Sequence, residues 1–136
     1  MIISGLLLAL AVVALVVWIL AIRDHAQRGV SGLVIQEIPW SPANPSADAT
    51  ISFTVVIKNQ GQANAAASQV DYYIDCSYYE SDSVGTIAAG GTSTQGFTWV
   101  AQPGTHTIQA IADSTQVVSE TDETNNEKEV VVFVYS

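Results

Sequence analysis

The stretch that decides the fold runs from Ala49 to Asn59 and reads ATISFTVVIKN. Its odd-numbered positions are apolar, namely Ile51, Phe53, Val55 and Ile57, and most of the positions between them are polar. A period of two is typical of a β-strand that is buried on one face only. The stretch therefore predicts a strand with one face in a core and the other in water.

Working outward from this strand, similar short runs recur along the chain, separated by turn residues such as Pro103-Gly104. The prolines at positions 39, 42 and 45 are expected to end the first run, because proline cannot donate to a strand ladder. We expect seven strands, at Leu33–Ile38, Ala49–Asn59, Gln69–Ser77, Ser83–Ile87, Thr92–Val100, Thr105–Asp113 and Glu127–Tyr135. Seven short strands without helices between them indicate an antiparallel immunoglobulin-like β-sandwich over residues 33–136.

The N-terminal segment differs from the rest of the chain. Residues 2–22 carry no charge, and 21 residues of helix at about 1.5 Å each match the roughly 30 Å of a bilayer core. We expect an apolar helix over residues 1–28, in a membrane or a filament core, and a hinge at 29–32. The predicted fold class is thus mainly β, with an N-terminal apolar α-helix before the seven-stranded sandwich.

Three roles compete for this segment. A cleavable signal would have a basic start and a shorter apolar run. In a single-pass anchor, Arg23 and Arg28 would follow the uncharged run, and these would hold the sandwich on the cytoplasmic side. The third role follows from a resemblance: MIISGLLLALAVVALVVWILAIRDHAQ is similar to the mature N-termini of type IV pilins and archaeal pilins. Gly5 stands where bacterial pilins commonly have glutamate, which favours the archaeal type.

The resemblance implies that copies pack through this helix in a filament core. Small residues allow helices to approach closely. The residues expected to make the helix contact are Gly5, Ala9, Leu10, Val13 and Val17.

Several stretches of the sandwich resemble the CARDB domain, a cell-adhesion-related domain found in bacteria and also in archaea. They are Pro39–Ala65, Phe97–Trp99, Pro103–Asp113 and VVSETDETNNEKEVVV at Val117–Val132. The resemblance covers about residues 33–134 and implies an extracellular spacer or adhesion module. The family usually has a glycine-rich hairpin where this chain has CSYYESD at Cys76–Asp82, so any specificity could reside there.

Composition excludes several functions. The formal net charge is −9, and only Lys58 and Lys128 are basic beyond residue 28, so we expect no nucleic-acid binding. His25 and His106 lie far apart and no catalytic motif occurs, so we expect no enzyme; His106 is interpreted as a partly buried structural residue. A copper site is disfavoured because the only methionine is Met1 and no histidine closely follows Cys76.

Two sites stay open at this stage. The acidic run before the last strand could be a hydrogen-bonded loop, or it could bind calcium through Glu120, Asp122 and Glu123, the only cofactor considered. Cys76 is expected to pack inward beside Ile74, or to form an intermolecular disulfide if its face is exposed.

The last strand is apolar on both faces. Val130, Val132 and Val134 share one face, and the other carries the residues Val131, Phe133 and Tyr135. An outer face of this kind indicates a subunit contact.

We therefore expect a structural subunit of an archaeal-type, pilus-like filament at the cell surface. Its partners would be copies of itself, and the membrane before assembly. The alternative is a single-pass membrane-anchored adhesion or spacer protein, or an accessory subunit of a membrane complex, with the sandwich outside. The surface ligand is unknown.

Overall fold

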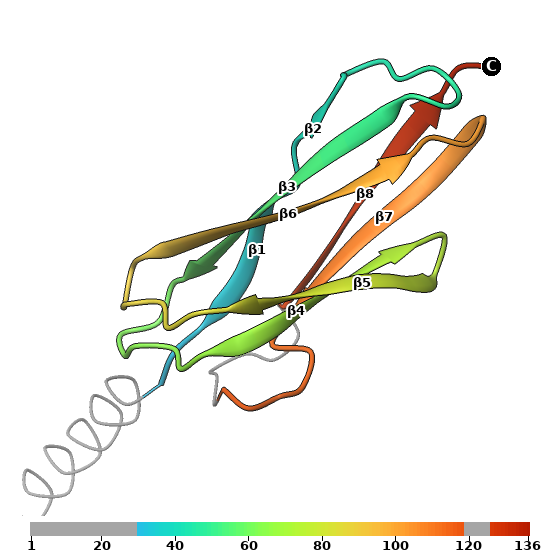
Figure 1. Cartoon of the computed structure of the whole chain (residues 1–136). Helices are drawn as coiled ribbons and strands as arrows, with labels where there is room; N and C mark the ends of the chain where they lie inside the picture. The colour runs from blue at the N-terminus through green and yellow to red at the C-terminus, as the bar shows by residue number, and fades with distance from the viewer. Residues whose placement is uncertain (1–29, 119–125) are drawn as a thin grey trace, which may run out of the picture.

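The computed structural model describes residues 30–118 and 126–136, which form two packed antiparallel sheets. The first sheet contains β1 (Leu33–Glu37), β2 (Trp40–Ser41), β3 (Thr50–Asn59) and β6 (Thr92–Val100). The second has the order β5 (Ser77–Val84), β4 (Ser68–Ile74), β7 (Gly104–Ala112), β8 (Glu127–Val134). Figure 1 shows that residue 30 and the C-terminus lie at opposite ends of the sandwich.

Strand β3 occupies the centre of the first sheet, as its alternation predicts. All four of its odd-numbered apolar side chains are buried, from Ile51 to Ile57. It pairs with β6 over nine residues, from Thr50 with Val100 to Lys58 with Thr92. The strand predicted at Ala49–Asn59 is therefore confirmed.

The core lies between the sheets around three stacked rings. Phe97 lies between Phe53 and Tyr72, with ring centroids 4.8 Å and 4.3 Å away. Tyr72 is fully buried, and its hydroxyl donates to the Asp82 carboxylate at 2.7 Å. Burial, reinforced by the Asp82 hydrogen bond and charge, raises the pKa of Tyr72 above its ordinary value. This phenol therefore stays neutral and serves the core as a large apolar side chain with one satisfied polar end.

The predicted count of seven strands is wrong, because the described residues contain eight. The prolines interrupt the first strand without ending it. Pro39 provides a carbonyl to the Thr54 N–H at 2.9 Å, and the chain then pairs again with β3 through Trp40 and Ser41. Proline is tolerated here because β1 and β2 lie at the edge of the sheet.

The strand predicted at Gln69–Ser77 is present but ends too late, and the strand predicted at Ser83–Ile87 is misplaced. The fourth strand ends at Ile74, and the fifth occupies Ser77–Val84, pairing with β4 from Ile74 with Ser77 to Ser68 with Val84. Strand β5 is polar and mostly exposed because it is an edge strand, so it lacks the apolar alternation on which the prediction relied.

The fold-class prediction also included an N-terminal helix, which lies outside the described residues. Those that are described contain no helix, and none that could cross a membrane was found among them.

Candidate interaction surfaces

The point where the N-terminal segment joins the sandwich is fixed by one buried side chain. Asn59 accepts the N–H groups of Gly32 and Gly61 at 3.0 Å each through Oδ1. Its Nδ2 donates to the carbonyls of Ala63 at 2.8 Å and Ile87 at 3.0 Å. Both donors and both lone pairs of the amide are thus used. From the end of β3, Asn59 therefore connects the segment before β1 with the β3–β4 loop and the β5–β6 loop.

Gly61 lies against the same junction. A Cβ atom at this position would be 2.6 Å from the Gly32 nitrogen and 2.5 Å from the Ser31 carbonyl carbon. These are backbone atoms that cannot rotate away, so only glycine fits. The turn at Lys58–Gly61, which lies within the stretch Pro39–Ala65 that resembles CARDB, therefore has a structural role.

The outer face of β8 carries an apolar stripe, which we define as Val131, Phe133 and Tyr135. These side chains are 61%, 53% and 51% exposed, whereas Val132 and Val134 between them are buried. The rings of Phe133 and Tyr135 contact each other edge to face, with centroids 4.9 Å apart. The structure thus places the predicted contact residues together on an exposed face.

The β4–β5 hairpin turns through Asp75 and Cys76, both with positive φ, of 52° and 67°. Two successive positive φ values fit a type I′ turn, in which asparagine and glycine are preferred. Cys76 is exposed and unbonded at the tip of this turn. The expectation that it packs inward is wrong, because the strand ends two residues earlier and the alternation does not continue through the turn.

Asp75 also links the hairpin to β7. Its Oδ1 accepts the Thr107 N–H at 3.0 Å, and its Oδ2 lies 2.6 Å from His106 Nδ1. The other ring nitrogen, His106 Nε2, is 2.9 Å from the Gln102 carbonyl oxygen. The His106 side chain is only 13% exposed, so its interpretation as a partly buried structural residue is confirmed.

These contacts shift both pKa values. The hydrogen bond from His106, and then the one from the Thr107 N–H, lower the pKa of Asp75. Partial burial disfavours the charged imidazole, but the hydrogen bond and charge of Asp75 and the carbonyls of Gln102 and Pro103 together raise the pKa of His106. A ring with an acceptor at each nitrogen is best satisfied when doubly protonated. When the ring is protonated, Asp75 and His106 form an ion pair and Nε2 donates to the Gln102 carbonyl.

The acidic run begins at Asp113, which is buried and has a φ of 48°. Its two carboxylate oxygens accept the N–H groups of Val117 and Val118, each at 3.0 Å. Asp113 is thus a loop-capping residue. The predicted calcium ligands Glu120, Asp122 and Glu123 lie outside the described residues, as do the helix positions Gly5, Ala9, Leu10, Val13 and Val17. Over residues 30–118 and 126–136, no cluster of three or more metal-ligating side chains occurs.

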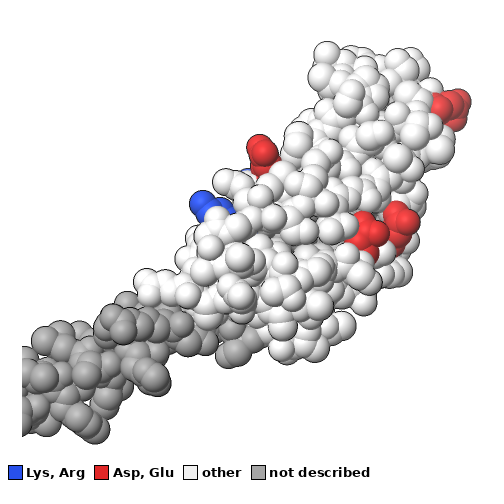
Figure 2. Space-filling model, turned by 60° about the vertical axis from the view of Figure 1, so that its left-hand side comes forward, with Lys and Arg blue, Asp and Glu red and all other residues white. Residues whose placement is uncertain are grey.

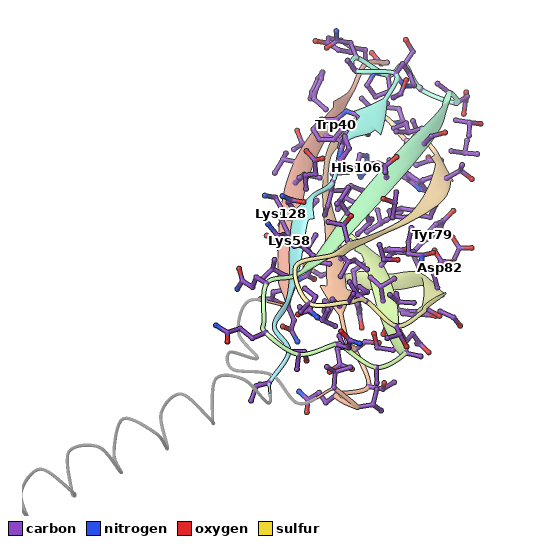
Figure 3. All side chains as sticks on the ribbon, turned by 90° about the vertical axis from the view of Figure 1, so that its left-hand side faces the viewer. Trp40, Lys58, Tyr79, Asp82, His106 and Lys128 are labelled. Atoms are coloured by element: carbon purple, nitrogen blue, oxygen red, sulfur yellow. The ribbon has the colours of Figure 1, made fainter. Side chains whose placement is uncertain are left out.

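Charge is sparse on the surface. Figure 2 shows a face on which acidic atoms form a few separate spots and no continuous charged patch. Figure 3 shows Lys58 and Lys128 toward one edge of the sandwich and Tyr79 and Asp82 toward the other. Tyr79 donates to the Thr98 carbonyl at 2.8 Å and thereby links the edge strands β5 and β6.

Residues 31–130 match the family profile of CARDB. The chain belongs to the CARDB family. This is a cell-adhesion-related domain of bacteria and archaea. No curated protein matches the chain in sequence.

Several solved structures share the fold. The crystal structure of the CARDB domain of PF1109 from Pyrococcus furiosus, in complex with di-metal ions, is 25% identical with a TM-score of 0.70; the match covers 77% of this chain and 89% of that one. A domain of a protein classed with the cell surface in Methanosarcina acetivorans is 19% identical, with a TM-score of 0.67 and coverage of 79% and 94%. A β-glucosidase from Listeria innocua is 16% identical with a TM-score of 0.52; the match covers 78% of this chain and only 16% of the enzyme. The last two similarities concern the fold alone.

Sequence reasoning missed two features of the site. The Asp75–His106 pair joins residues 31 positions apart, and no local pattern reveals such a contact. The Asn59 junction had a signal, the Lys58–Gly61 turn, but a turn alone does not show which distant loops its side chain reaches.

Proposed function

We propose that the chain is a structural subunit of the cell surface, with the sandwich facing outward for coating, spacing or adhesion. One observation carries the proposal: the N-terminal segment joins the sandwich at one end through the fully bonded Asn59 junction, while the apolar stripe leads toward the other. A module built in this way can be held at one end and still present a surface at the far end. Membership of a cell-adhesion-related family supports this role.

The finer proposal is an archaeal-type, pilus-like filament. Residues 1–28 would pack with their copies in the filament core, after passing through the membrane before assembly. The alternative is a single membrane-anchored module, or an accessory subunit of a membrane complex. In neither case does the proposal involve catalysis, a resident cofactor or nucleic acid.

Electron microscopy of material sheared from cells, with mass spectrometry of the fibres and of the N-terminus, separates these two forms. Uniform fibres that contain this chain would establish the filament. A chain that is recovered only by detergent, as single particles, would exclude the filament and leave the anchored module.

Metal binding is a second candidate, because the PF1109 domain was solved with di-metal ions. In this chain the ligands would be Glu120, Asp122 and Glu123, whose hard oxygens suit calcium. Calorimetry of the full chain with calcium, compared with a Glu120→Gln/Asp122→Asn/Glu123→Gln variant, tests the assignment. Binding that persists unchanged in the variant would refute these ligands.

A further inference from the structure

Strand β8 ends its sheet and has β7 on one side only. The direction of its backbone groups follows from Tyr135, whose N–H donates to the Pro45 carbonyl and whose carbonyl accepts the Ala47 N–H. Both groups therefore point away from β7. Because the direction alternates along a strand, the N–H and C=O groups of Glu129, Val131 and Phe133 point to the same open side.

Both ends of the β8 edge are covered, and only its middle is open. At the end of the chain, the segment Pro45–Ala47 covers Tyr135 through hydrogen bonds of 3.0 Å and 2.7 Å. At the start of β8, Lys128 Nζ reaches across to the Gln36 carbonyl at 3.4 Å. Among the residues that the structure describes, no strand pairs with the edge between these closures. A window of five residues, Glu129–Phe133, is left.

Natural edge strands are commonly protected by a lysine, a proline or a bulge. This window has no lysine, proline or bulge, its one charged residue is Glu129 at its end, and it reads EVVVF. Val131 and Phe133 are 61% and 53% exposed on its outer side. Unpaired backbone groups beside exposed apolar side chains are what an added β-strand requires.

We propose that this edge pairs with the same edge of a second copy, antiparallel and centred on Val131. In this register Val131 faces Val131, and Glu129 faces Phe133 of the second copy. The acidic residue of each window thus lies opposite an apolar ring. A parallel pairing in register would instead place Glu129 beside Glu129, which is unfavourable. The antiparallel arrangement has two-fold symmetry and joins the two β5–β4–β7–β8 sheets into one.

The pairing is short, so it is expected to be weak between free molecules and effective between copies held close together. The proposal deepens the proposed function by naming the partner of β8. The two can fail separately, because surface location is measured on cells and edge pairing on the purified chain.

Disulfide trapping of the full chain in detergent micelles tests the register. Cys76 is first replaced by serine, and single cysteines are then introduced as Val131→Cys, Glu129→Cys or Phe133→Cys. Directly opposed residues of a hydrogen-bonded antiparallel pair have Cα atoms about 5.5 Å apart, which a disulfide can span. Val131→Cys should form dimers without a second variant, at a yield about tenfold above that of Val100→Cys, a similarly exposed valine on β6.

The other two variants distinguish antiparallel from parallel pairing of the two β8 strands. Glu129→Cys and Phe133→Cys should cross-link efficiently when mixed and poorly alone. Adding Val131→Lys to the mixed pair should lower the yield about tenfold, because two ammonium groups would meet at the axis. Equal yields for Val131→Cys and Val100→Cys would overturn the proposal, as would strong cross-linking of Glu129→Cys alone. Circular dichroism of each variant checks that the sandwich is folded.

Discussion

The turns at Asn59 and at Asp75 each connect parts of the chain that are far apart in the sequence, but with side chains of different charge and burial. In both, a short polar side chain accepts backbone N–H groups from elsewhere in the fold. Asn59 is neutral and fully buried, whereas Asp75 is charged and half exposed. A buried amide with all its hydrogen bonds made is costly to disturb and indifferent to pH. A charged turn near the surface contributes less, and its contribution changes with pH.

The largest effect should come from Asn59→Ala. The change leaves two N–H groups and two carbonyls without their partner at a buried site, so we expect a loss of about 3 kcal/mol or more in the free energy of unfolding. Thermal unfolding of the full chain in detergent, followed by near-UV circular dichroism, measures it. Asn59→Asp is the matched control, because it keeps the acceptors and removes the donors. An Asn59→Ala variant as stable as the parent chain would contradict the role of this junction.

Next in size is Gly61→Ala, because the added methyl group meets the backbone of Ser31 and Gly32. We expect a loss of about 1–3 kcal/mol, as is typical of overpacking. Gly85→Ala serves as the control, since no atom lies within 4 Å of its Cβ position and its φ is not positive. That variant should be neutral or slightly stabilised. The same loss in both variants would show that steric contact is not the cause.

A smaller effect concerns pH. Because the pKa of His106 is raised, its contribution is complete below the unfolded value of about 6.5 and is lost as the pH rises through the folded value. Because the pKa of Asp75 is lowered, its contribution is present above 3.8 and is lost as the pH falls through its folded value.

The pair should therefore stabilise the fold most between about pH 4 and 6.5, by no more than about 1 kcal/mol at this degree of exposure. His106→Gln should remove this advantage and leave stability at pH 9 nearly unchanged. Melting temperatures of both proteins across the pH range provide the test. An identical pH profile in the two proteins would refute the ion pair.

The smallest change expected is a gain. Cys76 adopts a φ of 67° in the hairpin, where glycine is at ease and other residues are strained. Cys76→Gly should stabilise the chain by about 0.5–1 kcal/mol, after the entropic cost of glycine is included. Cys76→Ser keeps the strain and should be nearly neutral, so a gain of equal size in the serine variant would point to the thiol instead.

Much of the fold could be predicted from alternation, and the exceptions have physical causes. Strand β3 has one buried face, so the alternation of apolar residues in its sequence shows directly which side chains lie in the core. Strand β5 lies at an edge, so apolar and polar residues do not alternate along it. Its Asp75-Cys76 turn also lacks the asparagine and glycine that are preferred there. The strand pairing that resumes after Pro39 shows that proline ends a strand ladder only where a backbone N–H is needed at its position. The stripe on β8 was predictable because an apolar outer face is unusual, whereas the Asp75–His106 contact depends on tertiary packing.

The proposed function requires that the sandwich is displayed outside the cell. Antibodies against the purified chain can be applied to intact cells and, in parallel, to permeabilised cells. We expect labelling of intact cells at nearly the level of permeabilised ones. Labelling that appears only after permeabilisation would place the sandwich inside the cell and contradict the proposed function.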